Sequence, residues 1–166
     1  MTATDSAHAE AKGALLLAAI CGVMHLAVDF ATVTSTYRAA RAVEGPGFFG
    51  PFEIVLGYDL MAFGLQVPLG LATDWLRGAR VALVGGLVLT LAGLFALPAS
   101  AAGTMALAGI GNALFHLGGG AMVLSAARGK AGPAGVFVAP GAIGLGLGIW
   151  FGRGGVAPAW PISVLI

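Results

Sequence analysis

The sequence is poor in charge, and this scarcity argues against most classes of soluble protein. Only 9% of its 166 residues are charged, comprising 8 Lys and Arg and 7 Asp and Glu, whereas 58% are hydrophobic. Soluble domains carry about 25% charged residues, and a chain with so few charges cannot cover its surface with polar groups. Disordered chains are rich in charge and poor in apolar residues. The composition therefore excludes disorder and disfavours an ordinary soluble domain.

Other scarcities narrow the choice further. The single cysteine, Cys21, cannot form a disulfide within the chain, and a net charge of +1 does not indicate a nucleic acid or an acidic partner. Glycine is abundant instead, with 28 residues, but the sequence lacks the Gly-X-Y period of collagen. Small residues allow close approach of helices in membranes. The composition predicts an all-α polytopic membrane protein.

The apolar residues form five runs, each long enough to cross a bilayer as a helix of about 20 residues. The predicted spans are residues 13–34, 54–73, 81–97, 104–124 and 133–151. A further run, 156–166, is too short to span, and we expect it either to lie at the membrane interface or to be part of a longer sixth span. Residues 1–12 are polar, and we expect them to be a tail that precedes a bundle comprising residues 13–166. A signal peptide is the alternative for the first run, but this run is long and contains His25 and Asp29.

The distribution of Lys and Arg predicts the orientation of the bundle. Short loops on the cytoplasmic side of a membrane are enriched in Lys and Arg. Five fall on one side and three on the other: Lys12, Arg77, Arg80, Arg128 and Lys130 against Arg38, Arg41 and Arg153. The sequence therefore predicts a protein of the cell (inner) membrane with a cytoplasmic N-terminus and tail.

Polar side chains within the predicted spans are the candidates for function. A charged group in the hydrocarbon costs about 2.5–3.5 kcal/mol on the insertion scale, so such groups face a bundle interior or a wet cavity. His25 and Asp29 are spaced i,i+4 and share one helical face, which Thr32 extends. Asn112 and His116 have the same i,i+4 spacing in the fourth run.

The second run contributes Tyr58, Asp59 and Gln66. Its direction puts Asp59 toward the outer side of the membrane, where Asp29 is also expected, whereas His25 lies near the middle of its run. A histidine beside a carboxylate takes up and releases a proton near neutral pH, which is the chemistry of a proton-coupled carrier.

Structural roles are the alternatives for these groups. His25 and Asp29 would form a hydrogen bond that stabilises one helix, His116 would bond a backbone carbonyl, and Asp59 would reach water at the interface.

No Cys or His lies at metal-ligand spacing from either histidine, no Lys-Ser/Thr follows the glycines 118–120, and no Ser/His/Asp nucleophile pattern is present. We expect no enzyme activity, no cofactor and no metal. The glycine-rich stretch 141–148 predicts a packing face.

One loop resembles a motif of the major facilitator superfamily. Residues 70–74 (Gly70-Leu71-Ala72-Thr73-Asp74) precede Arg77, Gly78 and Arg80 between the second and third spans. In that family a glycine, an aspartate and arginines clamp the cytoplasmic end of the bundle. The resemblance implies a cytoplasmic latch that comprises Gly70, Asp74, Arg77 and Arg80.

Three further stretches resemble the fosmidomycin-resistance branch of this superfamily. They are residues 25–29 (His25-Leu26-Ala27-Val28-Asp29), residues 109–116 (Gly109-Ile110-Gly111-Asn112-Ala113-Leu114-Phe115-His116), and Tyr58 with Gln66-Val67-Pro68. The sequence departs from the branch after the second histidine, where Leu117 replaces a proline and Gly118 replaces a polar or acidic residue.

The superfamily fold comprises about twelve helices in two halves of six, so the resemblance implies an N-terminal half of such a transporter. The chain would be a fragment, a half-length relative or one member of a pair of identical chains. The function that it implies is proton-coupled transport or efflux of a small molecule, with the first, second, fourth and fifth spans along the path. The alternative is a non-transporting membrane protein with an assembly or stability role. Without a second bundle, we expect the polar stripe of His25, Asp29 and His116 to face lipid.

Overall fold

The computed structural model describes residues 3–43 and 49–154, and within these ranges the chain is helical and contains no strand. The elements are α1 (Ala3–Ala42), α2 (Pro51–Asp59), the π-helical turn η1 (Leu60–Gly64), α3 (Gln66–Trp75), α4 (Ala79–Ala96), α5 (Ala101–Ala127) and α6 (Ala131–Gly154).

Five helical segments of the described chain are long and apolar enough to cross a membrane. They are His8–Ala42, Pro51–Trp75, Ala79–Ala96, Ala101–Ala127 and Ala131–Gly154. The second of them combines α2, η1 and α3. The prediction of an all-α protein with five apolar spans is confirmed, and the partial sixth span, 156–166, lies outside the described residues.

The first helix begins earlier than its apolar run. Residues 3–12, which we expected to be a polar tail, form the first turns of α1. This segment is rich in alanine, the residue with the highest helix propensity, and Asp5 in the first turn interacts favourably with the helix dipole. Polarity alone therefore does not mark the start of this helix.

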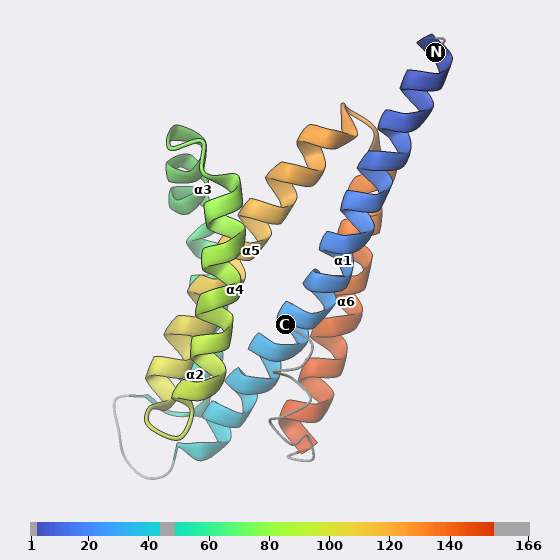
Figure 1. Ribbon diagram of the computed structural model, residues 1–166. Coiled ribbons are helices and arrows are strands. Elements are labelled where there is room, and N and C mark those ends of the chain that lie inside the picture. The colour runs from blue at the N-terminus through green and yellow to red at the C-terminus, as the bar shows by residue number, and fades with distance from the viewer. Residues whose placement is uncertain (1–2, 44–48, 155–166) are drawn as a thin grey trace.

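The bundle is built from two helix pairs that cross each other (Figure 1). α1 packs along α6, α4 packs along α5, and α1 also crosses α5. The N-terminal end of α1, the α3–α4 turn and the α5–α6 turn lie at one end of the molecule. This alternation agrees with the predicted grouping of the basic loops on one side.

Glycines permit the close approach of both pairs. A methyl group at Gly86 or Gly118 would overlap backbone atoms across the α4–α5 contact. On α6, a methyl group at Gly144 would overlap the backbone of α1, whereas Gly146 has nothing within 4 Å. The glycine-rich stretch of α6 is therefore a packing face on one side only.

The second span is interrupted by η1, and Pro68 accounts for the position of this turn. Proline has no N–H to donate, and its ring clashes with the carbonyl of the residue four positions earlier. That residue is Gly64, at which η1 ends. The ladder resumes where Leu69 N–H donates to Leu65 O at 3.0 Å.

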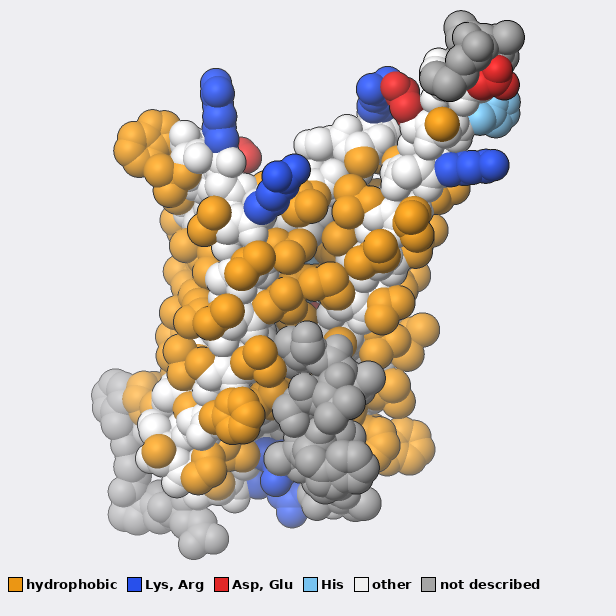
Figure 2. Space-filling view, in the orientation of Figure 1, with side chains coloured by type: hydrophobic (Ala, Val, Ile, Leu, Met, Phe, Trp, Pro, Cys, Tyr) orange, Lys and Arg blue, Asp and Glu red, His pale blue; other side chains and the backbone are white. Residues whose placement is uncertain are grey.

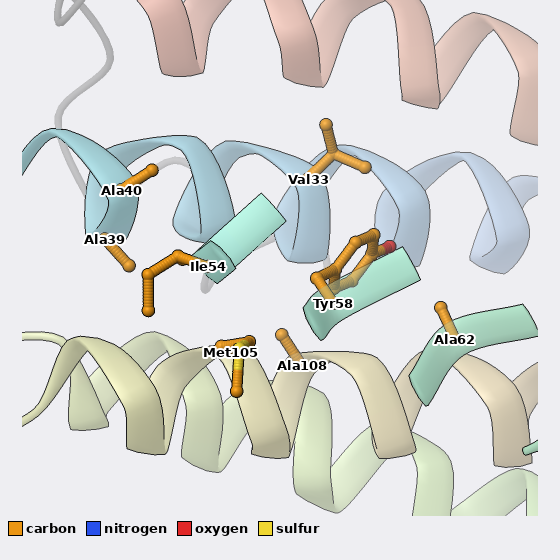
Figure 3. Close-up of a cluster of buried hydrophobic side chains, with 8 residues drawn as sticks. All are labelled: Val33, Ala39, Ala40, Ile54, Tyr58, Ala62, Met105 and Ala108. Atoms are coloured by element: carbon orange, nitrogen blue, oxygen red, sulfur yellow. The ribbon is translucent and has the colours of Figure 1, made fainter. Parts of the chain in front are cut away.

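One cluster of buried apolar side chains joins α1, α2, η1 and α5, and a second joins α1, α5 and α6. In Figure 3 the Tyr58 ring extends from α2 toward the part of α1 that holds Val33, and Ile54 and Met105 belong to the same cluster. The outer surface is also apolar: Figure 2 shows hydrophobic side chains over the middle of the molecule and Lys and Arg side chains near its two ends. This distribution suits a bilayer, where charged groups are favoured at the aqueous boundaries.

Candidate functional site

Two helices bring together polar groups that lie far apart in the sequence. His25 and Asp29 extend from α1, and Asn112 and His116 extend from α5. His25 Nε2 lies 3.2 Å from Asp29 Oδ2 and 2.6 Å from His116 Nε2. His116 Nε2 lies 3.8 Å from Asp29 Oδ1. We refer to His25, Asp29 and His116 as the His–Asp–His cluster.

The cluster lies inside the bundle, so the expectation that its stripe faces lipid is wrong. His25 and Asp29 are buried, and the His116 side chain is 20% exposed. The expectation assumed that only a second bundle could cover the stripe. In the structure α5 crosses this face of α1 and α6 packs beside it, so one chain encloses most of the cluster.

Nδ1 of each histidine lies within hydrogen-bond distance of a backbone carbonyl oxygen. His25 Nδ1 lies 2.9 Å from the carbonyl oxygen of Phe137 on α6, and His116 Nδ1 lies 2.8 Å from that of Asn112. A backbone carbonyl only accepts hydrogen bonds, so each Nδ1 carries a hydrogen and donates it. In a neutral ring Nε2 then bears a lone pair.

The two Nε2 atoms therefore face each other as acceptors at 2.6 Å. Two lone pairs at this distance repel, whereas a proton between them makes a short N–H···N hydrogen bond. The nearby Asp29 carboxylate balances the charge of that proton. The geometry therefore suits one proton shared between the two rings, beside the Asp29 side chain.

A hydrogen-bond network orients the carboxylate. The side-chain amide of Asn112 donates to Asp29 Oδ1 at 2.8 Å and to Thr32 Oγ1 at 3.2 Å. Thr32 donates to Val28 O at 2.8 Å and accepts from the Tyr58 hydroxyl at 3.0 Å. The network thus connects α1, α2 and α5 around Asp29.

Two of the predicted residues do not join this network. Asp59 is exposed, which agrees with the alternative that its carboxylate reaches water. It borders a cavity of about 140 Å³ that Thr36 and Tyr58 also line. Gln66 donates to the carbonyl of Ala62 in its own helix at 2.9 Å.

Aromatic rings and a glycine confine the histidines. The Phe137 ring stacks on His25 with centroids 4.8 Å apart, and Phe115 lies 5.9 Å from the same ring. A methyl group at Gly141 would overlap the His25 ring. Sequence reasoning did not find Phe137 or Gly141 as site residues, although Gly141 lies in the predicted packing stretch.

The predicted latch residues lie in and beside the α3–α4 turn. Arg77 adopts a left-handed backbone conformation with φ 50°, and its N–H donates to Asp74 O at 3.1 Å. Asp74, Arg77 and Arg80 are exposed and border an open depression of about 920 Å³. In the described chain the Asp74 carboxylate forms no ion pair with either arginine. Gly70 lies on α3, where a methyl group would approach Leu117 to 3.2 Å.

Comparison with protein-family models, curated proteins and solved structures gives no match to this chain. The functional argument therefore depends on the geometry of the described residues and on their chemistry.

Proposed function

We propose that this protein is a secondary membrane transporter of the facilitator type, in which the His–Asp–His cluster takes up and releases a proton as a small molecule crosses the membrane. One observation carries the proposal: two imidazoles and a carboxylate converge among apolar spans, with their Nε2 atoms 2.6 Å apart. Ionisable groups inside membrane bundles commonly mark ion paths and proton relays.

The proton has a place in this mechanism. When the imidazole pair holds it, the cluster is neutral overall because Asp29 is negative. When the proton leaves, the two Nε2 lone pairs repel each other and the His25–His116 contact opens. α1 and α5 carry these two rings, so proton loss changes the force between the two helix pairs. A change of this kind can bias an equilibrium between two bundle arrangements.

The resemblance to the major facilitator superfamily supports the same proposal. It implies the architecture of half a transporter, an inner-membrane location and a cytoplasmic latch. It also implies a second bundle, which would be either another copy of this chain or a C-terminal half. The spans that would line the path include α1 and α5, which hold the cluster.

The test is proton movement in liposomes that contain the purified full chain and an internal pH-sensitive dye. We expect at least one solute, from a panel of organic molecules and divalent cations, to collapse an imposed pH gradient. Asp29→Asn should abolish this flux because it removes the charge that balances the proton. Asp5→Asn is the matched control, because Asp5 lies on the same helix but about 36 Å along its axis.

The competing function is a non-transporting role in assembly or stability, which the extensive hydrogen bonding of Asp29 favours. Under this alternative no solute collapses the gradient in the wild-type vesicles, and Asp29→Asn changes only the stability of the fold. Proton flux that is equal in the wild type and Asp29→Asn would also contradict the proposed role of the cluster.

A further inference from the structure

The His–Asp–His cluster also has the composition and convergence of a metal site. Its ligand atoms, one from each residue, all lie within 4.8 Å of one another. We propose that the cluster binds a divalent transition-metal ion through His25 Nε2, His116 Nε2 and the Asp29 carboxylate. The assignment of this ion as the transported substrate rests on the proposed function.

The orientation of the rings fits metal binding. Metal-ligating histidines usually donate their other ring N–H to a carbonyl or carboxylate, which points the free nitrogen at the ion. His25 does so toward Phe137 O, and His116 does so toward Asn112 O. The Asn112 amide similarly holds Asp29 Oδ1 at 2.8 Å. Each of the three ligands therefore has a partner that fixes its direction.

The donor set selects the class of ion. Two imidazoles favour zinc, nickel, cobalt or iron over magnesium and calcium, which prefer oxygen ligands. The described cluster includes no thiolate. Three protein ligands leave the fourth coordination position open for water or another small ligand, as in catalytic zinc sites. Structural zinc sites have four protein ligands.

Binding requires a small movement of the rings. Tetrahedral coordination at about 2.0–2.1 Å would separate the two Nε2 atoms by roughly 3.4 Å, compared with 2.6 Å in the structure. His25 is confined by Phe137 and by the backbone at Gly141, whereas the His116 side chain is 20% exposed. His116 is therefore the ring that moves outward to admit the ion.

Metal binding and proton binding exclude each other at this site. The ion occupies the space between the same two lone pairs that share the proton, so one proton is released to bulk water for each ion bound. The exchange therefore takes up M²⁺ and releases H⁺. Affinity must fall as the pH is lowered because the imidazoles are then protonated.

The first experiment measures binding to the detergent-solubilised full chain, purified without a polyhistidine tag. Titration with Co²⁺ should give one saturable site per chain with the visible absorption of a tetrahedral complex, and Zn²⁺ should displace it. A weakly buffered titration should release about one proton for each ion bound. Asp29→Asn, His25→Gln and His116→Gln should each weaken binding at least about 100-fold.

His8→Ala is the matched control, because it removes the third histidine, about 25 Å from His25 along α1. It should leave binding unchanged. Gly141→Ala keeps all three ligands but pushes on the His25 ring, and it should weaken binding about 10-fold, the lower end of outer-shell effects. Size-exclusion profiles identify any variant that fails to fold, and Gly141→Ala then still tests the site.

Two results would overturn the metal site: no saturable binding to the wild type, or binding that His8→Ala removes and His25→Gln does not. Zn²⁺ uptake into liposomes then separates the two proposals. Binding without uptake leaves the metal site standing and contradicts transport of the ion. Proton flux driven by an organic solute, without any Co²⁺ binding, contradicts the metal site and leaves the transport function standing.

Discussion

At the scale of single residues, the buried hydroxyl groups of this protein fall into two kinds. Thr32 is fully buried and connects the Tyr58 hydroxyl with the Asn112 amide that holds Asp29. Thr90 is equally buried, but its hydroxyl has no hydrogen-bond partner in the described chain. Loss of a buried hydrogen bond leaves its partners unsatisfied, whereas loss of an unpaired hydroxyl removes a desolvation penalty.

We therefore expect Thr32→Val to lower the free energy of unfolding by about 1–2 kcal/mol, since hydrogen bonds between membrane helices contribute up to roughly that amount. Thr90→Val keeps the same shape and should leave stability unchanged or raise it by up to about 1 kcal/mol. Denaturant titration of both variants in mild detergent measures the difference. Equal losses in the two variants would contradict the assigned network.

At the scale of elements, the helices approach each other through glycine. On α6, Gly144 faces the α1 backbone, whereas a methyl group at Gly146 would have nothing within 4 Å. The two glycines are only two positions apart. Helical geometry explains the difference, because positions two apart lie on nearly opposite faces of a helix. The α1–α6 contact also holds the Phe137 carbonyl beside His25, so this packing serves the site as well as the fold.

Substitution at these two glycines should therefore have opposite effects. Gly144→Ala should destabilise the bundle by about 1–3 kcal/mol because its methyl group overlaps backbone that cannot move independently. Gly146→Ala should be neutral or stabilising by roughly 0.5–1 kcal/mol, since alanine favours the helix. Thermal unfolding in detergent compares them, and a stabilising Gly144→Ala would contradict the close α1–α6 contact.

A variant in the α3–α4 turn tests the latch that the family resemblance implies. Asp74 is exposed and forms no ion pair with Arg77 or Arg80, so Asp74→Asn should change the unfolding free energy by less than about 0.5 kcal/mol. The same variant should slow solute-driven proton flux in liposomes, because a latch acts through the charge of Asp74. Wild-type flux in Asp74→Asn would reject the latch.

At the scale of the whole molecule, the surface and the helix directions describe a membrane bundle. Large apolar side chains such as Val67, Phe95 and Trp150 are exposed, and apolar side chains cover the middle of the molecule in Figure 2. In water such a surface would drive aggregation, but in a bilayer it contacts lipid.

Reporter fusions at Lys12, Ala79 and Lys130 should all report the cytoplasm, and a fusion at Ala99 should report the opposite side. The alternating helix directions put the first three positions at one end of the molecule, and the excess of basic residues there predicts the cytoplasmic side. A fusion at Ala79 that reports the outside would contradict this orientation.

Sequence patterns were enough to predict membrane-spanning helices and the approximate positions of five of them. Charge scarcity and the lengths of the apolar runs predict membrane-spanning helices, because hydrocarbon excludes charge and sets the length of a span. The i,i+4 spacing in α1 and α5 likewise predicts local polar faces. The interruption of the second span at η1 was not predicted. Pro68 explains it, because proline cannot donate a backbone hydrogen bond within the helix.

Which polar faces meet became clear from the packing of the helices. His25 and His116 are 91 positions apart, so spacing along the chain could not reveal a shared proton or a three-ligand cluster, and the sequence argued against a metal. Local periodicity describes one helix, whereas the crossing of α1 and α5 and the position of Phe137 on α6 depend on packing between helices that are far apart in the sequence. The same crossing buried a polar stripe that we expected to face lipid, and left Asp59 outside the network.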